Sequence, residues 1–149
     1  MMINKTVSYY NNADDSKSKI RYNLDYVLGM IRDDQELFQQ TVRLRSISTE
    51  EEYKQAKKLL PMIAPSGVFD YRNDNPENLR EYSNVLVLDF DHFQNHLDAG
   101  EFKRNLIDNA DRLYIYALWF SPSGLGVKVA MLHDNTTPMY HNELFRCIR

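Results

Sequence analysis

The 149-residue chain contains few of the residues that carry special structural or chemical roles. Its single cysteine, Cys147, cannot form an internal disulfide. Its four histidines show no zinc-ligand spacing with one another or with that cysteine, so a hydrogen-bonded or solvated histidine is the simpler interpretation of each. No run approaches the roughly 18 apolar residues of a membrane span, and no signal-like segment follows Met1. We therefore expect a cytoplasmic protein that does not enter a membrane.

The chain also lacks an excess of positive charge. Lysine and arginine number 18 against 21 aspartate and glutamate residues, a net charge of −3. Binding of a nucleic acid would therefore need a local basic patch, because the summed charge repels a polyanion. The length, with 43% hydrophobic and 26% charged residues, predicts one ordinary globular domain.

The most informative stretch is an apolar run that ends in two aspartates. Residues 85–88 are Val-Leu-Val-Leu, and Asp89-Phe90-Asp91 follows directly. A run without polar alternation predicts a strand that is buried on both faces and central in its sheet. Because side chains alternate across a strand, Asp89 and Asp91 should share one face, about 6 to 7 Å apart. Such a pair suits a divalent cation, although aspartates after strands also start turns and cap helices.

A second motif, Ser-Pro-Ser-Gly-Leu-Gly-Val-Lys, covers residues 121–128 between two predicted strands. Its glycines, Gly124 and Gly126, allow close approach of a ligand, Ser121 and Ser123 offer hydroxyl groups, and Lys128 offers a positive charge. These features are typical of a phosphate-binding loop. The spacing differs from a Walker A loop, and a simple hairpin turn with convenient glycines is the alternative.

Together the two motifs could form the halves of a nucleotidyl-transfer site, in which metal-bound carboxylates and basic groups hold a triphosphate. A third carboxylate is normally needed, and Asp134 is the local candidate. Arg43 and Arg45 are candidates for contact with template phosphates, with ordinary solvated arginines as the alternative.

The remaining pattern mixes strands and helices. We expect strands over residues 6–10, 41–45, 62–64, 68–71, 84–91, 112–120 and 127–132, and helices over 18–32, 34–40, 49–60, 92–108 and from 138 onward. Residues 62–71 would form a short hairpin or a strand-loop-strand unit, and 72–81 a polar surface loop. The mixture predicts an α+β or α/β fold, with residues 1–60 mainly helical and 61–149 carrying the sheet and both motifs. The last helix has no stop signal before Arg149, so we expect one domain that continues beyond it.

Three segments, in this order, resemble a known family: residues 60–69 (Leu-Pro-Met-Ile-Ala-Pro-Ser-Gly-Val-Phe), 85–91 and 120–128. They are similar to the N-terminal domain of virulence-associated protein E-like proteins, which is similar to the archaeo-eukaryotic primase superfamily. The resemblance covers roughly residues 5–149. It implies an α+β primase-polymerase fold with an RRM-like mixed sheet flanked by helices.

The resemblance also implies an activity, the synthesis of primers or DNA and RNA in the replication of a mobile element or phage. Asp89 and Asp91 would be the catalytic ligands of Mg²⁺ or Mn²⁺. Ser121, Ser123, Gly124, Gly126 and Lys128 would bind the nucleoside triphosphate, with Lys128 standing where many primases carry a histidine. Expected partners are a single-stranded DNA template and a helicase-like ATPase in the same or another chain.

Two other functions remain open. The family's third acidic motif has no clear counterpart before Arg149, so the domain could be a catalytically inactive nucleic-acid-binding or protein-interaction module of the same fold. A metal-dependent nuclease or other phosphohydrolase would share the two aspartates, but it explains the serine-glycine-lysine loop less well.

Overall fold

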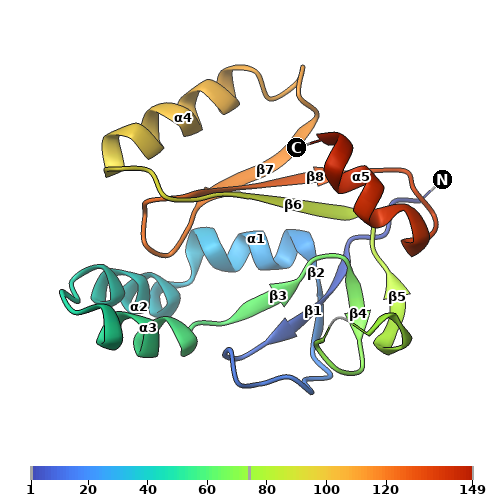
Figure 1. Ribbon diagram of the computed structural model, residues 1–149, viewed down its shortest axis with the longest axis horizontal. Helices are drawn as coiled ribbons and strands as arrows, with labels where there is room; N and C mark the ends of the chain where they lie inside the picture. The colour runs from blue at the N-terminus through green and yellow to red at the C-terminus, as the bar shows by residue number, and fades with distance from the viewer. Residues whose placement is uncertain (1, 74, 149) are drawn as a thin grey trace.

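Residues 2–73 and 75–148 are described by a computed structural model, in which they form five α-helices and three small sheets (Figure 1). The predicted α+β class is confirmed. Every strand pair is antiparallel, so the expectation of one mixed sheet is wrong. Most strands here are short. Antiparallel strands can be joined by a short connection, whereas parallel strands need a long crossover. None of the helices within the described ranges is long and apolar enough to cross a membrane.

The first sheet has the order β2-β1-β3, with β1 at Thr6–Tyr10, β2 at Arg21–Asn23 and β3 at Met62–Ala64. Helix α1 spans Leu24–Asp33, so the predicted helix start near residue 18 is wrong. Residues 21–23 instead pair with β1, and the side chain of Asn23 caps the helix by accepting a hydrogen bond from the amide of Asp25. The first sheet contains strands from both sides of residue 60, because β3 pairs with β1.

Helix α2 spans Gln35–Arg45, which corrects the prediction of an extended segment at 41–45. Asp34 caps it through the amide of Leu37, and the Thr41 hydroxyl donates back to the carbonyl of Leu37. The β-branched residues at 41 and 42 suggested a strand, but burial of Leu44 on the inner helix face outweighs that weak preference. Successive helix positions are about 100° apart, so Arg43 and Arg45 do not share the single face expected of a strand.

Helix α3 spans Glu50–Lys58, and Pro61 follows its end. Strand β4 (Gly67–Phe69) pairs with β5 (Leu79–Tyr82), after a 3₁₀ turn at Pro76–Asn78. The hairpin considered for residues 62–71 is therefore wrong, since β3 and β4 pair with different partners. The predicted polar loop is shorter than expected because residues 79–82 form a strand. Residue 74 of that loop lies outside the described residues, as does Arg149.

The third sheet has the order β6-β8-β7, with β6 at Val85–Phe90, β7 at Ile115–Phe120 and β8 at Val127–Leu132. Strand β6 is thus an edge strand and not the central one, although its aliphatic residues are largely buried. An edge strand can be covered on both faces when other elements pack above and below its sheet. That is the case here, which explains the continuous apolar run.

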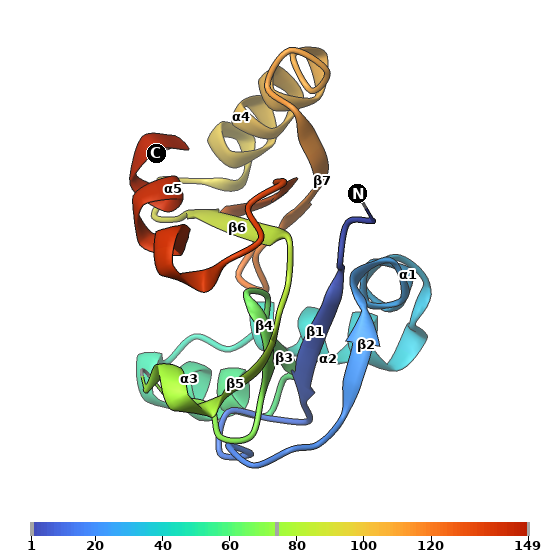
Figure 2. The same cartoon turned by 90° about the vertical axis from the view of Figure 1, so that its right-hand side faces the viewer.

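Each face of this sheet covers its own core. One face packs Val85 and Ala130 against Val7 of β1 and Leu24 of α1. The other packs Leu86, Leu88, Val127 and Val129 against two helices, α4 (His96–Asp108) and α5 (His141–Ile148). Figures 1 and 2 show α4 and α5 outside the sheet and α1 on its inner side. The described chain is therefore layered, with the third sheet between α1 on one side and α4 and α5 on the other.

Candidate functional site

The two sequence motifs meet at one end of the third sheet. Asp89 pairs with Lys128, and Phe90 pairs with Val127, in the antiparallel register of β6 and β8. The residues that follow β6 therefore lie beside those that precede β8. The loop at 121–126 joins β7 and β8 as a hairpin. The hairpin turn and the phosphate-binding loop considered for this motif are therefore the same segment and do not exclude each other.

Asp89 is engaged by a basic residue of the second motif. Lys128 Nζ forms an ion pair with Asp89 Oδ2, and the two side chains are 27% and 43% exposed. Trp119, the only tryptophan, pairs with Lys128 on the neighbouring strand. Cross-strand partners project to the same face, so the indole lies on the face that carries this ion pair.

Asp91 lies against the glycine loop. A β-carbon built on Gly126 would stand 2.1 Å from Asp91 Oδ1 and 2.9 Å from Ser121 Oγ. Gly126 and Lys128 are two residues apart and project to one face, as positions i and i+2 do. Both carboxylates therefore lie beside residues of the second motif, Asp89 beside Lys128 and Asp91 beside Gly126.

The loop itself is held by internal hydrogen bonds. Ser121 and Gly126 are joined by an amide-to-carbonyl bond of 2.8 Å, as are Gly124 and Ser121. The hydroxyls of Ser121 and Ser123 are 3.0 Å apart, and the amide of Leu125 donates to Ser123 Oγ. Ser121 is buried. These bonds engage much of the hydrogen-bonding capacity of the loop, so recognition of an anion there would depend mainly on the surrounding basic side chains.

Two residues that the motif analysis did not assign to the loop contact it at Gly124. This glycine has φ 76°, and a β-carbon on it would stand 2.9 Å from His96 Nδ1 and 3.3 Å from Arg45 Cζ. His96 Nδ1 is 3.2 Å from the Gly124 carbonyl oxygen, and Arg45 Nε donates to the Pro122 carbonyl at 2.9 Å. Arg45 belongs to α2 and His96 begins α4, so no local sequence pattern links either of them to the loop.

Two other candidates lie elsewhere. Asp134 follows the far end of β8, where Leu132 pairs with Val85, so it lies about 20 Å along the sheet from Asp89. It therefore cannot complete a metal site with the two aspartates. Arg43 is exposed on α2, with no side-chain hydrogen bond or ion pair inside the described ranges.

The two carboxylates fit the protein's share of a Mg²⁺ or Mn²⁺ site. No group of three or more histidine, cysteine, aspartate or glutamate side chains among the described residues is arranged to hold a metal. Mg²⁺ in phosphate-transfer sites is usually bound by one or two carboxylates, with substrate phosphates and water completing its shell. Asp89 and Asp91 meet this requirement once Asp89 leaves Lys128.

The comparison with known families identifies one match. The family described as "BT4734-like, N-terminal domain" matches residues 54–146, which is more than half of the chain. The match includes both motifs and His96, whereas Arg45 precedes it. No curated protein and no solved structure matches the chain. The chain belongs to the BT4734-like N-terminal domain family.

Proposed function

We propose that this domain is a primase-polymerase-like nucleotidyltransferase that performs metal-dependent synthesis of primers or of DNA or RNA in the replication of a mobile element or phage. The observation that carries the proposal is the contact between Asp91 and Gly126, which joins the two motifs in one site. The resemblance of residues 60–69, 85–91 and 120–128 to virulence-associated protein E-like domains, and through them to the archaeo-eukaryotic primases, supports the same activity.

In this proposal the carboxylates and the basic residues have separate roles. Asp89 and Asp91 hold Mg²⁺ or Mn²⁺, which when bound supplies positive charge to the triphosphate. Lys128, Arg45 and His96 surround the loop at 121–126 and attract the phosphates. Gly126 keeps the loop close to Asp91, so the phosphates and the carboxylates share one surface.

The ion pair between Asp89 and Lys128 is compatible with this function. Both side chains are partly exposed, and an exposed ion pair contributes about 1 kcal/mol or less to stability. A divalent cation with a bound triphosphate offers each partner a stronger interaction, because the cation attracts Asp89 and the phosphates attract Lys128. The pair therefore holds the two residues close to their proposed ligands in the free protein.

The proposal is tested by binding and by activity. Titration of Mn²⁺ and a nucleoside triphosphate should change the fluorescence of Trp119, and Asp89→Asn should abolish the response to Mn²⁺. Asp108→Asn, an exposed change at the end of α4, is the matched control. Labelled nucleotides should be incorporated on single-stranded DNA with Mn²⁺. Incorporation that survives replacement of both Asp89 and Asp91 by alanine would contradict the mechanism.

A non-catalytic nucleic-acid-binding module is the second candidate. In such a module Asp89 would stay paired with Lys128 and would need no metal. Such a module would bind single-stranded DNA without metal, and its affinity would fall steeply with salt concentration. Calorimetry with and without Mn²⁺ distinguishes the two functions.

A further inference from the structure

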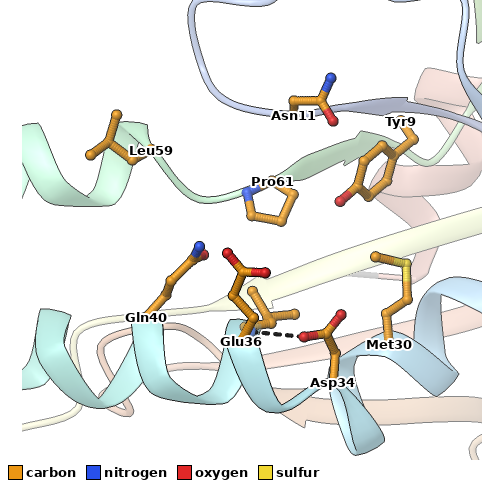
Figure 3. A pocket seen from close by; sticks show the side chains of 9 residues that line it. Tyr9, Asn11, Met30, Asp34, Glu36, Gln40, Leu59 and Pro61 are labelled. Atoms are coloured by element: carbon orange, nitrogen blue, oxygen red, sulfur yellow. Dashed lines mark hydrogen bonds between the residues drawn. The ribbon is translucent and has the colours of Figure 1, made fainter.

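A groove of about 260 Å³ lies between the start of α2 and the ends of β1 and α3 (Figure 3). It is separate from the candidate site. Asp34 precedes α2 and lines the groove, whereas Arg45 ends the same helix beside the loop at 121–126. A helix of 11 residues is about 16 Å long, so the groove and the loop lie at opposite ends of α2.

Three side chains at the start of α2 contribute oxygen atoms to the wall of the groove: Asp34, Glu36 and Gln40. Asp34 uses Oδ1 to accept the amide of Leu37. No hydrogen bond or ion pair engages the carboxylate of Glu36 within residues 2–73 and 75–148. Gln40 Oε1 is fully buried and lacks a hydrogen-bond partner among the same residues. The carboxylates of Asp34 and Glu36 keep further lone pairs as acceptors, so this wall is complementary to a ligand with several N–H groups.

The charge of the groove points to a cation. Among the described residues, its lining contains the carboxylates of Asp34 and Glu36 and no lysine or arginine. Burial, together with neighbouring Tyr22 and Asp34, raises the pKa of Tyr9, whose ring forms part of the opposite side. Figure 3 shows the hydroxyl end of Tyr9 and the carboxylate of Glu36 directed toward the space between β1 and α2.

The remaining surface suits an aliphatic stem. Met30, Leu59 and Pro61 supply apolar contacts, and Leu59 is 71% exposed at the rim. The volume is below the roughly 300 to 1,000 Å³ of typical small-molecule pockets, and it is large enough for one long side chain. A guanidinium is planar, carries five N–H donors and stacks on aromatic rings, which an ammonium group does less well.

We propose that this groove binds an arginine side chain presented by a partner polypeptide. The guanidinium lies between the carboxylates of Asp34 and Glu36 and contacts the ring of Tyr9. Its aliphatic stem lies on Met30 and Leu59. This inference is independent of the proposed nucleotidyl transfer.

The test is an NMR titration of the whole chain with three blocked tripeptides, Gly-Arg-Gly, Gly-citrulline-Gly and Gly-Lys-Gly. The arginine peptide should shift the backbone signals of Tyr9 and Asn11 and the side-chain amide of Gln40, with a millimolar dissociation constant. Citrulline has nearly the same shape without the charge and should bind at least about tenfold more weakly. The lysine peptide should be intermediate.

Glu36→Gln should weaken binding of the arginine peptide about tenfold, which corresponds to about 1.4 kcal/mol. Glu101→Gln, an exposed change on α4, should leave it unchanged. Circular dichroism checks that both variants keep their helices. Equal binding of arginine and citrulline peptides, an unaffected Glu36→Gln variant, or shifts confined to other surfaces would overturn the proposal. Equal binding of the lysine peptide would overturn the assignment to arginine.

Discussion

The carboxylate of Asp91 occupies the space that a side chain at position 126 would need. A β-carbon on Gly126 would stand 2.1 Å from Asp91 Oδ1 and 3.0 Å from the carbonyl oxygen of Phe90. Gly126 is therefore required because its backbone lies close to Asp91. Gly124 is required for two reasons, its close neighbours and its positive φ. This contact makes the two sequence motifs one structural unit.

Gly126→Ala should destabilise the protein by about 1 to 3 kcal/mol, because the added methyl group displaces Asp91 and crowds the backbone. Urea denaturation measures the loss. In an Asp91→Ala background the same change should have a smaller effect, since the closest contact is gone. Additive effects of the two changes would show that they do not interact.

Arg45→Met should weaken nucleotide binding and lower stability by about 1 kcal/mol, because Arg45 donates to the Pro122 carbonyl and lies beside Gly124. Arg43→Met, on the same helix, is the control and should change neither quantity, because no hydrogen bond of the described residues joins the Arg43 side chain to the loop. Calorimetry with a nucleoside triphosphate and urea denaturation give the two values. An Arg43 variant as impaired as the Arg45 variant would indicate a non-specific charge effect.

Lys128→Met should separate metal binding from triphosphate binding. Without its lysine partner, Asp89 is free to bind a cation, so affinity for Mn²⁺ alone should rise. Affinity for the triphosphate should fall about tenfold or more, because a charged contact to the phosphates is lost. Fluorescence of Trp119 reports both titrations. A parallel fall in both affinities would argue against competition between Lys128 and the metal.

Asn84→Ala should destabilise the protein by about 2 to 4 kcal/mol, more than is usual for a polar residue. The buried Asn84 accepts from the amide of Asn4 through its side chain and donates to the carbonyl of Asn135. Its backbone also bonds Asn4 and His133. Thermal unfolding measures the effect, and Asn142→Ala on the last helix is the control.

Stability should fall as the pH drops below about 6.5, the ordinary pKa of histidine in an unfolded chain. Burial lowers the pKa of His133, assisted by nearby His141 and opposed by Asp134, and burial also lowers the pKa of His141. Below pH 6.5 the unfolded chain therefore binds more protons than the folded one, and the free energy of unfolding decreases.

Urea denaturation at pH 7.5 and 5.5 measures this loss. Replacing His133 and His141 together by leucine should flatten the pH dependence, whereas His92→Asn, at an exposed position, should not. An unchanged slope in the double variant would assign the effect to other groups.

Local sequence signals predicted many of the elements correctly. The apolar run at 85–88 marks β6, and the segment 127–132 is β8 as expected. Thr49 and Pro61 bracket α3, and the strand at 6–10 was also predicted. These features depend on side-chain periodicity and on residues next to one another in the chain, so a single sequence is enough to reveal them.

Pairing between distant segments was not predictable in the same way. Strand β6 lies at an edge, β3 and β4 pair with different strands, and 41–45 joins a helix. Strand order depends on how the sheets pack, and weak β-preference at Thr41 and Val42 is overridden by burial of a nearby leucine.

By itself, the sequence determined the residue types of the candidate site: two carboxylates at a strand end and a serine-glycine loop that ends in lysine. Only the tertiary structure decided which groups meet there. It placed Asp91 against Gly126, paired Asp89 with Lys128, brought Arg45 and His96 to Gly124, and set Asp134 at the far end of the sheet. The physical reason is that alternation and capping are properties of neighbouring residues, whereas contacts between separate elements follow from strand register and the packing of helices on the sheet.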